Sequence, residues 1–74
     1  MAKLQIALQD NSYAEVYDFI HVKAVGTDLT LEFGIDDFDN LPLRDGATYA
    51  FIGKDMSVSL CGAVIKYLLL DKQG

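Results

Sequence analysis

Two short segments with an apolar residue at every second position constrain the fold of this chain most strongly. Residues 19–25 read Phe-Ile-His-Val-Lys-Ala-Val and residues 29–33 read Leu-Thr-Leu-Glu-Phe, with Gly26-Thr27-Asp28 between them. This alternation places one side of each segment in a core and the other side in water. The pattern predicts a β-hairpin over residues 19–33. The residues expected on the apolar sides are Ile20, Val22, Ala24, Leu29, Leu31 and Phe33.

Several other segments also favour strands. Residues 3–9 alternate cleanly and predict a half-buried strand. Residues 47–52 and 56–61 lie on either side of Gly53-Lys54-Asp55, which is typical of a second hairpin. Residues 64–70 are apolar apart from Lys66 and predict a further strand.

Residues 13–25 allow two interpretations. Ser12 and Glu15 have the spacing of a capping box, which favours a helix that would end near Gly26. The segment is nevertheless rich in aromatic and β-branched residues, which favour strands. We prefer a strand, with a bulge near Asp18–Phe19 that changes which face is apolar.

These elements predict the fold class. The chain has 74 residues, which is the size of a single small domain over residues 1–74. Five to six short strands predict an all-β fold, as a small, strongly bent sheet or a barrel that hides its edges. The alternative is an α+β fold, with residues 13–25 helical on a four-stranded sheet.

Charge and cysteine content limit the environment and the partners. The net charge of −5 disfavours direct binding to nucleic acid or to an anionic membrane. Cys61 is the single cysteine, so no internal disulfide can form, and we expect a reducing compartment such as the cytoplasm. The first ten residues contain no long apolar run, so we expect no signal peptide there, and no apolar run reaches the roughly 20 residues that a membrane helix needs.

Aromatic residues give one further candidate for nucleic-acid binding. Small barrels bind single strands by stacking bases on aromatic rings inside a basic groove. The six Lys and Arg residues are scattered singly, so we expect the aromatic residues to belong to the core instead. The aromatic residues considered are Tyr13, Tyr17, Tyr49 and Phe51.

The residue types needed for catalysis or for a cofactor are sparse. His21 and Cys61 form the only His–Cys combination, and neither lies in a catalytic motif. Two such residues are too few for a structural zinc site. Residues 36–40 supply oxygen donors for a weak calcium site, but their spacing does not fit an EF-hand loop. We therefore expect a non-enzymatic protein without cofactor or metal.

Acidic residues are concentrated in one segment. Residues 28–45 contain six acids and the single base Arg44, a net charge of −6 + 1 = −5. A solvated loop that keeps the protein soluble is the simpler interpretation. A functional interpretation is an acidic patch that imitates nucleic acid and inhibits a basic DNA- or RNA-binding protein. The patch would consist of Asp36, Asp37, Asp39 and Asp45.

The strand predicted at residues 64–70 is apolar on both faces. A strand in a small sheet normally has one face on the core and one in water. Val64, Leu68 and Leu70 would occupy one face. The other face predicts a homo-oligomer interface, most economically a dimer across a twofold axis. It consists of Ile65, Tyr67 and Leu69. The leading expectation is a binding or scaffold module that acts through protein contacts and self-association.

Overall fold

The computed structural model describes residues 2–73, which form seven β-strands and two short 3₁₀ turns. This part of the chain contains no α-helix, so the all-β prediction is confirmed and the α+β alternative is wrong. In chain order the elements are β1 (Lys3–Leu8), β2 (Tyr13–Tyr17), β3 (Phe19–Val25), β4 (Thr30–Gly34), η1 (Phe38–Asn40), β5 (Thr48–Gly53), β6 (Ser57–Cys61), η2 (Gly62–Val64) and β7 (Ile65–Asp71).

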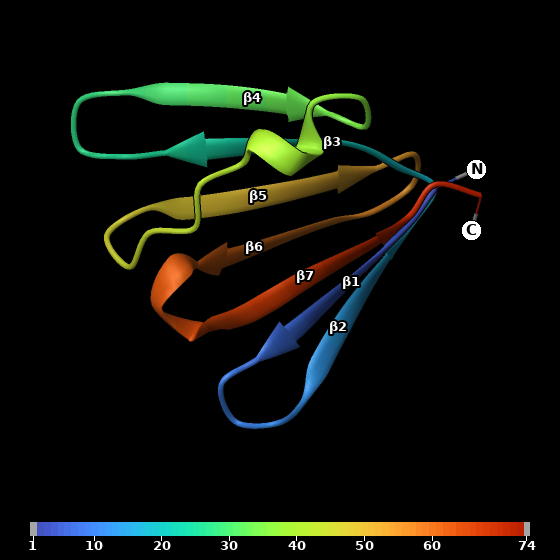
Figure 1. Ribbon diagram of the computed structural model, residues 1–74, viewed down its shortest axis with the longest axis horizontal. Helices are drawn as coiled ribbons and strands as arrows, with labels where there is room; N and C mark the ends of the chain where they lie inside the picture. Colours follow the sequence, from blue (N-terminus) through green and yellow to red (C-terminus); the bar gives the residue numbers. More distant parts are fainter. Residues whose placement is uncertain (1, 74) are drawn as a thin grey trace.

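The strands form two antiparallel sheets. One has three strands in the order β2-β1-β7, and the other has four in the order β4-β3-β5-β6. Figure 1 shows the sheets close together at the end that carries both termini and further apart at the opposite end. Of the two forms predicted, a strongly bent sheet or a barrel, the barrel is absent, because β6 and β7 do not pair with each other and the two sheets are not closed.

A sharp corner at Asp18 explains why there are more strands than expected. Asp18 has a positive φ of 54°, and it separates β2 in one sheet from β3 in the other. The Asp18 carbonyl accepts a hydrogen bond from the Lys54 N–H at 3.1 Å, which fixes the corner against the β5–β6 turn. A register shift between Phe19 and His21 lies next to the position where a bulge was predicted. It turns Phe19 into the core and leaves Ile20 exposed.

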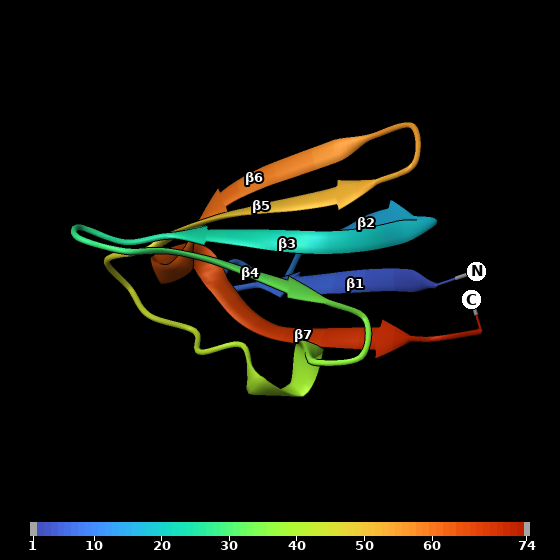
Figure 2. The same cartoon turned by 90° about the horizontal axis from the view of Figure 1, so that it is seen from above.

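The hairpin predicted over residues 19–33 is present, because β3 pairs antiparallel with β4. Val22 and Ala24 are buried, as their alternation indicates. Leu29 and Leu31 are exposed, however. Figure 2 shows the reason: the β3–β4 turn projects beyond the three-stranded sheet, which therefore leaves this end of β4 uncovered.

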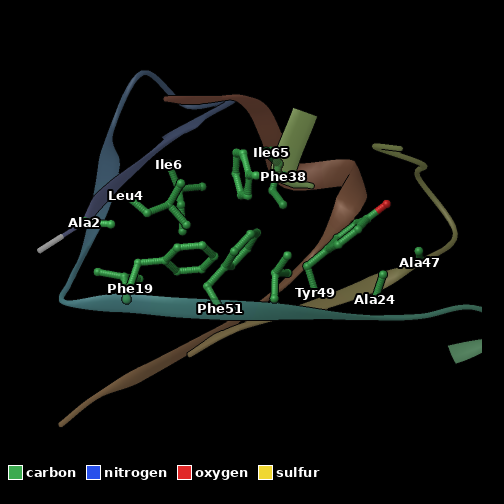
Figure 3. Close-up of a cluster of buried hydrophobic side chains, with 12 residues drawn as sticks. Ala2, Leu4, Ile6, Phe19, Ala24, Phe38, Ala47, Tyr49, Phe51 and Ile65 are labelled. Carbon is green, nitrogen blue, oxygen red and sulfur yellow. The ribbon is translucent and has the colours of Figure 1, made fainter. Parts of the chain in front are cut away.

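The core lies between the two sheets. Figure 3 shows Leu4 and Ile6 pointing from β1 toward Phe19 and Phe51 on the opposite sheet. Phe38 enters this cluster from η1. The Tyr49 hydroxyl lies at the margin of the cluster, where it accepts a hydrogen bond from the Arg44 N–H at 2.8 Å and donates one to a backbone carbonyl of the same segment. The segment that leads into β5 is thereby tied to the core.

Candidate functional site

The outer face of the three-stranded sheet is the candidate functional site. Leu4 and Ile6 point inward, so the alternate residues of β1 and their cross-strand neighbours point outward. Figure 1 shows this sheet as the lower layer, formed by β2, β1 and β7. We call the surface the tyrosine face. It consists of Lys3, Gln5, Ala7, Tyr13, Glu15, Tyr17, Tyr67, Leu69 and Asp71.

Large side chains on the tyrosine face are exposed to solvent. Relative exposures are 61 % for Tyr13, 55 % for Tyr17, 54 % for Tyr67 and 57 % for Leu69. Three of the four tyrosines in the chain therefore lie on one face of one sheet. Scattered single apolar residues are normal on a protein surface, whereas a group of them indicates an interaction site.

Strand register sets how these side chains are arranged. Tyr13 and Tyr67 both lie opposite Ala7, one on each side of β1. The small side chain between two large ones leaves a shallow hollow, whose lining includes all three residues. In the next row, Leu69 lies opposite Gln5. The apolar part of the face is therefore continuous along β7 and faces solvent.

A small charged group orders the β2 side of the tyrosine face. The Lys3 ammonium contacts the Glu15 carboxylate, with Nζ–Oε2 at 2.6 Å, and lies 5.7 Å from the centre of the Tyr17 ring. The Tyr17 hydroxyl donates to Glu15 Oε1 at 3.4 Å. The hydrogen bond from Lys3 lowers the pKa of Glu15, and the same bond raises the pKa of Lys3. These contacts restrain the Tyr17 ring. The positive charge of Lys3 also balances the negative charge of Glu15 on this face.

The structure separates the three residues predicted for the oligomer interface. Tyr67 and Leu69 are exposed on the tyrosine face, but Ile65 is only 5 % exposed and belongs to the core. The physical reason is an irregularity in β7: Leu8 lies opposite Ile65 while Ala7 lies opposite Tyr67, so Lys66 is an extra residue. The extra residue turns Ile65 to the inner face.

Tyr13 and Tyr17 were not predicted as part of this site. A signal was present, because Tyr13, Glu15 and Tyr17 alternate with the smaller apolar Ala14 and Val16. The larger residues were expected inside, but Val16 is buried and both tyrosines are exposed. The expectation that aromatic residues form the core is correct for the other two residues considered, Tyr49 and Phe51.

The acidic residues are divided between two places. Asp36, Asp37 and Asp39 are exposed around η1, directly after β4. Asp37 also has a structural role, because its carboxylate accepts a hydrogen bond from the Gly34 N–H at 2.6 Å. Asp45 lies in the turn before β5, whose flanking residues border the same hollow as the β3–β4 turn. The β3–β4 turn and η1 lie at opposite ends of β4, so Asp45 is apart from the other three.

The residues considered for catalysis and for metal binding do not come together. His21 lies opposite Ile52 and Cys61 opposite Thr48, which places them two strands and four residues apart, or roughly 16 Å. Across residues 2–73, no three His, Cys, Asp or Glu side chains are close enough to share a metal ion. Within the same range, no helix has the length and apolar character needed to cross a membrane.

Comparison of this chain with protein-family models, with curated proteins and with solved structures finds no match.

Proposed function

We propose that this protein is a small non-enzymatic interaction module that associates with a second copy of itself through the tyrosine face. The exposure of Tyr13, Tyr17, Tyr67 and Leu69 on one face is the observation that supports the proposal. Tyrosine is enriched at protein interfaces, because its ring supplies apolar area while its hydroxyl remains hydrogen-bonded. The net charge of −5 favours a protein over a polyanion as the partner.

We expect this association to be in the micromolar range. Burying a side chain of the size of Leu69 contributes about 1.5–3 kcal/mol before the costs of association are subtracted. The burial of several such side chains would offset the costs of association, whereas the burial of one would not. The interface would be at the small end of the known range, where complexes are transient.

The experiment is a comparison of two surface substitutions by sedimentation velocity. Leu69→Lys places a charge on the tyrosine face and should give a monomer. Val25→Lys is the matched control, because Val25 is also exposed but lies on the other sheet. Both changes are at the surface and should alter stability by under about 0.5 kcal/mol. Equal association of Leu69→Lys and the unmodified protein would refute the proposal.

Salt dependence separates this proposal from an electrostatic one. Association through apolar side chains should persist at high ionic strength. Exposed charges, in contrast, are screened within about 4–5 Å at about 0.5 M salt. Loss of the dimer at that salt concentration would show that charges, and not the tyrosine face, hold the copies together.

A second candidate function is an acidic surface that occupies the nucleic-acid site of a basic protein. One observation favours it: Asp36, Asp37 and Asp39 lie on a turn whose backbone Phe38 anchors in the core, and the Asp37 carboxylate is held by the Gly34 N–H. Replacing all three by Asn removes the charge, and an Asn at position 37 keeps an oxygen acceptor for the Gly34 N–H.

The triple Asn variant tests this candidate directly. Extract from the native cell is passed over the immobilised unmodified protein and over the variant, each at low and at high salt. A basic protein retained only by the unmodified chain, and only at low salt, would support the acidic surface. Identical retention by both chains would remove the candidate.

A further inference from the structure

A hollow of about 120 Å³ opens at the end of the core that lies opposite the two termini. Leu31 of β4 and Tyr49 of β5 both lie opposite Ala24 of β3, one on each side. The small side chain between two large ones leaves the hollow, and Figure 3 shows Ala24 at this end of the core, beside Tyr49. Leu29 adds to the apolar lining at the β3–β4 turn, where its side chain is exposed.

The opposite wall of the hollow is the segment that leads into β5, and its backbone is firmly held. Pro42 and Arg44 lie in this wall. The Tyr49 hydroxyl accepts a hydrogen bond from the Arg44 N–H at 2.8 Å and donates one to the Pro42 carbonyl at 2.5 Å. The Arg44 carbonyl accepts from the Ala47 N–H at 3.2 Å and lies directly beside Gly62. The hollow is therefore preformed, as sites for small molecules usually are.

Arg44 is the only basic residue that lines the hollow within residues 2–73. Its side chain is exposed, and it also borders the adjoining, more polar hollow at the β3–β4 turn. In the described part of the chain the Arg44 guanidinium makes no ion pair, although Asp28 borders the adjoining hollow and Asp45 follows Arg44 in sequence. A guanidinium without a partner can bind a carboxylate through two parallel N–H donors. Apolar walls and a binding group for an anion therefore meet at one place.

We propose that this hollow binds a small apolar carboxylic acid, with its hydrocarbon chain over Ala24 and its carboxylate on Arg44. The size of the hollow limits the chain: an apolar cavity of about 150 Å³ holds benzene, so about 120 Å³ has room for about five carbon atoms. The inference does not depend on self-association, because no residue of the tyrosine face lines the hollow.

The charge of the protein makes the carboxylate the informative part of the ligand. A net charge of −5 repels anions in general. Without a specific contact, a neutral amide of the same shape should therefore bind more tightly than the acid. A preference for the acid would report the contact with Arg44.

A titration with two matched molecules tests the proposal. 4-Methylpentanoate and its neutral amide, 4-methylpentanamide, are added separately to the unmodified protein, and binding is followed by the NMR shifts of backbone amides. A ligand of this size should bind with a Kd of about 1 mM. The acid should bind about three- to fivefold more tightly than the amide, as expected for an exposed ion pair. The largest shifts should be those of Ala24, Leu31 and Ala47.

Two results of this titration would overturn the proposal. One is the absence of shifts around the hollow up to about 10 mM acid, which is ten times the expected Kd. The other is tighter binding of the amide than of the acid.

Two pairs of substitutions locate the site. Arg44→Gln should remove the preference for the acid, whereas Lys54→Gln removes a base outside the hollow and should retain it. Leu29→Ser should weaken the binding of both molecules, whereas Leu43→Ser should not, because Leu43 is also exposed but does not line the hollow. All four positions are exposed, so the fold should be kept. An equal preference for the acid in Arg44→Gln and Lys54→Gln would place the carboxylate elsewhere and overturn the proposal.

N-acetyl-leucine distinguishes a free acid from the C-terminal residue of a peptide. It has the same branched chain and carboxylate as 4-methylpentanoate, together with the amide group that a peptide would add. We expect it to bind no more tightly than 4-methylpentanoate, because the hydrocarbon chain already fills the hollow. Binding that is about tenfold tighter would show that the site takes a peptide terminus and would overturn the assignment to a free acid.

Discussion

The rings of Phe19 and Phe38 meet edge to face, with their centroids 5.6 Å apart and their planes at 82°. Phe19 begins β3 directly after the corner at Asp18, and Phe38 begins the short turn η1. Aromatic pairs in this arrangement stabilise beyond the area that they bury. The contact therefore ties the acidic turn to the corner that joins the two sheets.

Removing this contact should destabilise the fold and release the acidic turn. We expect Phe38→Ala to lower the free energy of unfolding by about 3 kcal/mol, out of about 4–11 kcal/mol for a chain of this size. Chemical denaturation measures the loss, and amide exchange across residues 36–40 should accelerate. Phe38→Leu is the control and should cost less. Unchanged stability in Phe38→Ala would show that the turn is not anchored by this ring.

Gly62 should be intolerant of any side chain. A Cβ at this position would lie 1.9 Å from the Arg44 carbonyl oxygen, and the Gly62 N–H donates to the Ala47 carbonyl at 2.8 Å. The backbones must separate to admit a methyl group, so Gly62→Ala should cost about 2–3 kcal/mol or more. Gly46→Ala is the control, because no atom lies within 4 Å of its Cβ position. Equal melting temperatures for the two variants would contradict this packing.

The ion pair between Lys3 and Glu15 predicts a pH dependence. The pKa of Glu15 is lowered in the folded state, chiefly by the hydrogen bond from Lys3, so the folded chain binds this proton less readily than the unfolded chain. Its stabilising contribution is present at neutral pH and is lost as the pH falls through the lowered pKa. Lys3→Met should raise the pKa of Glu15, as followed by NMR titration of its side-chain carboxyl carbon. An unchanged titration midpoint would show that Lys3 is not the cause.

Much of the strand pattern could be predicted from alternation alone. A strand with one face on the core requires an apolar residue at every second position, and β1, the β3–β4 hairpin and the β5–β6 hairpin all show this. Local alternation carries no information about which strands share a sheet. The chain passes between the two sheets twice, at the corner at Asp18 and through η2 between β6 and β7. The corner at Asp18 has no glycine that would indicate it in the sequence.

Two of the misplaced residues, Ile20 and Ile65, share one physical cause. An extra residue in a strand reverses the faces of everything that follows, and it leaves little trace in the sequence. The shift at Phe19–His21 turns Ile20 outward, and the extra Lys66 turns Ile65 inward. Phe38 was missed for a different reason: the acidic residues around it indicate a solvated loop, but its own ring is buried.

The candidate site was predictable only in part. The two-sided apolar character of residues 64–70 indicated an interaction surface, and Tyr67 and Leu69 are indeed exposed. The contribution of β2 could not be derived from that segment, because it depends on β1 placing β2 and β7 on either side of itself. The residues that flank β7 in the sequence do not indicate that β1 lies between β2 and β7.

Self-association is the central claim, and the mass of the unmodified protein in solution tests it most directly. Light scattering after gel filtration, at tens of micromolar to match the expected affinity, reports that mass without reference to shape. We predict a dimer of about 16.4 kDa, twice the chain mass of 8.2 kDa. A single species of 8.2 kDa at that concentration would contradict the account.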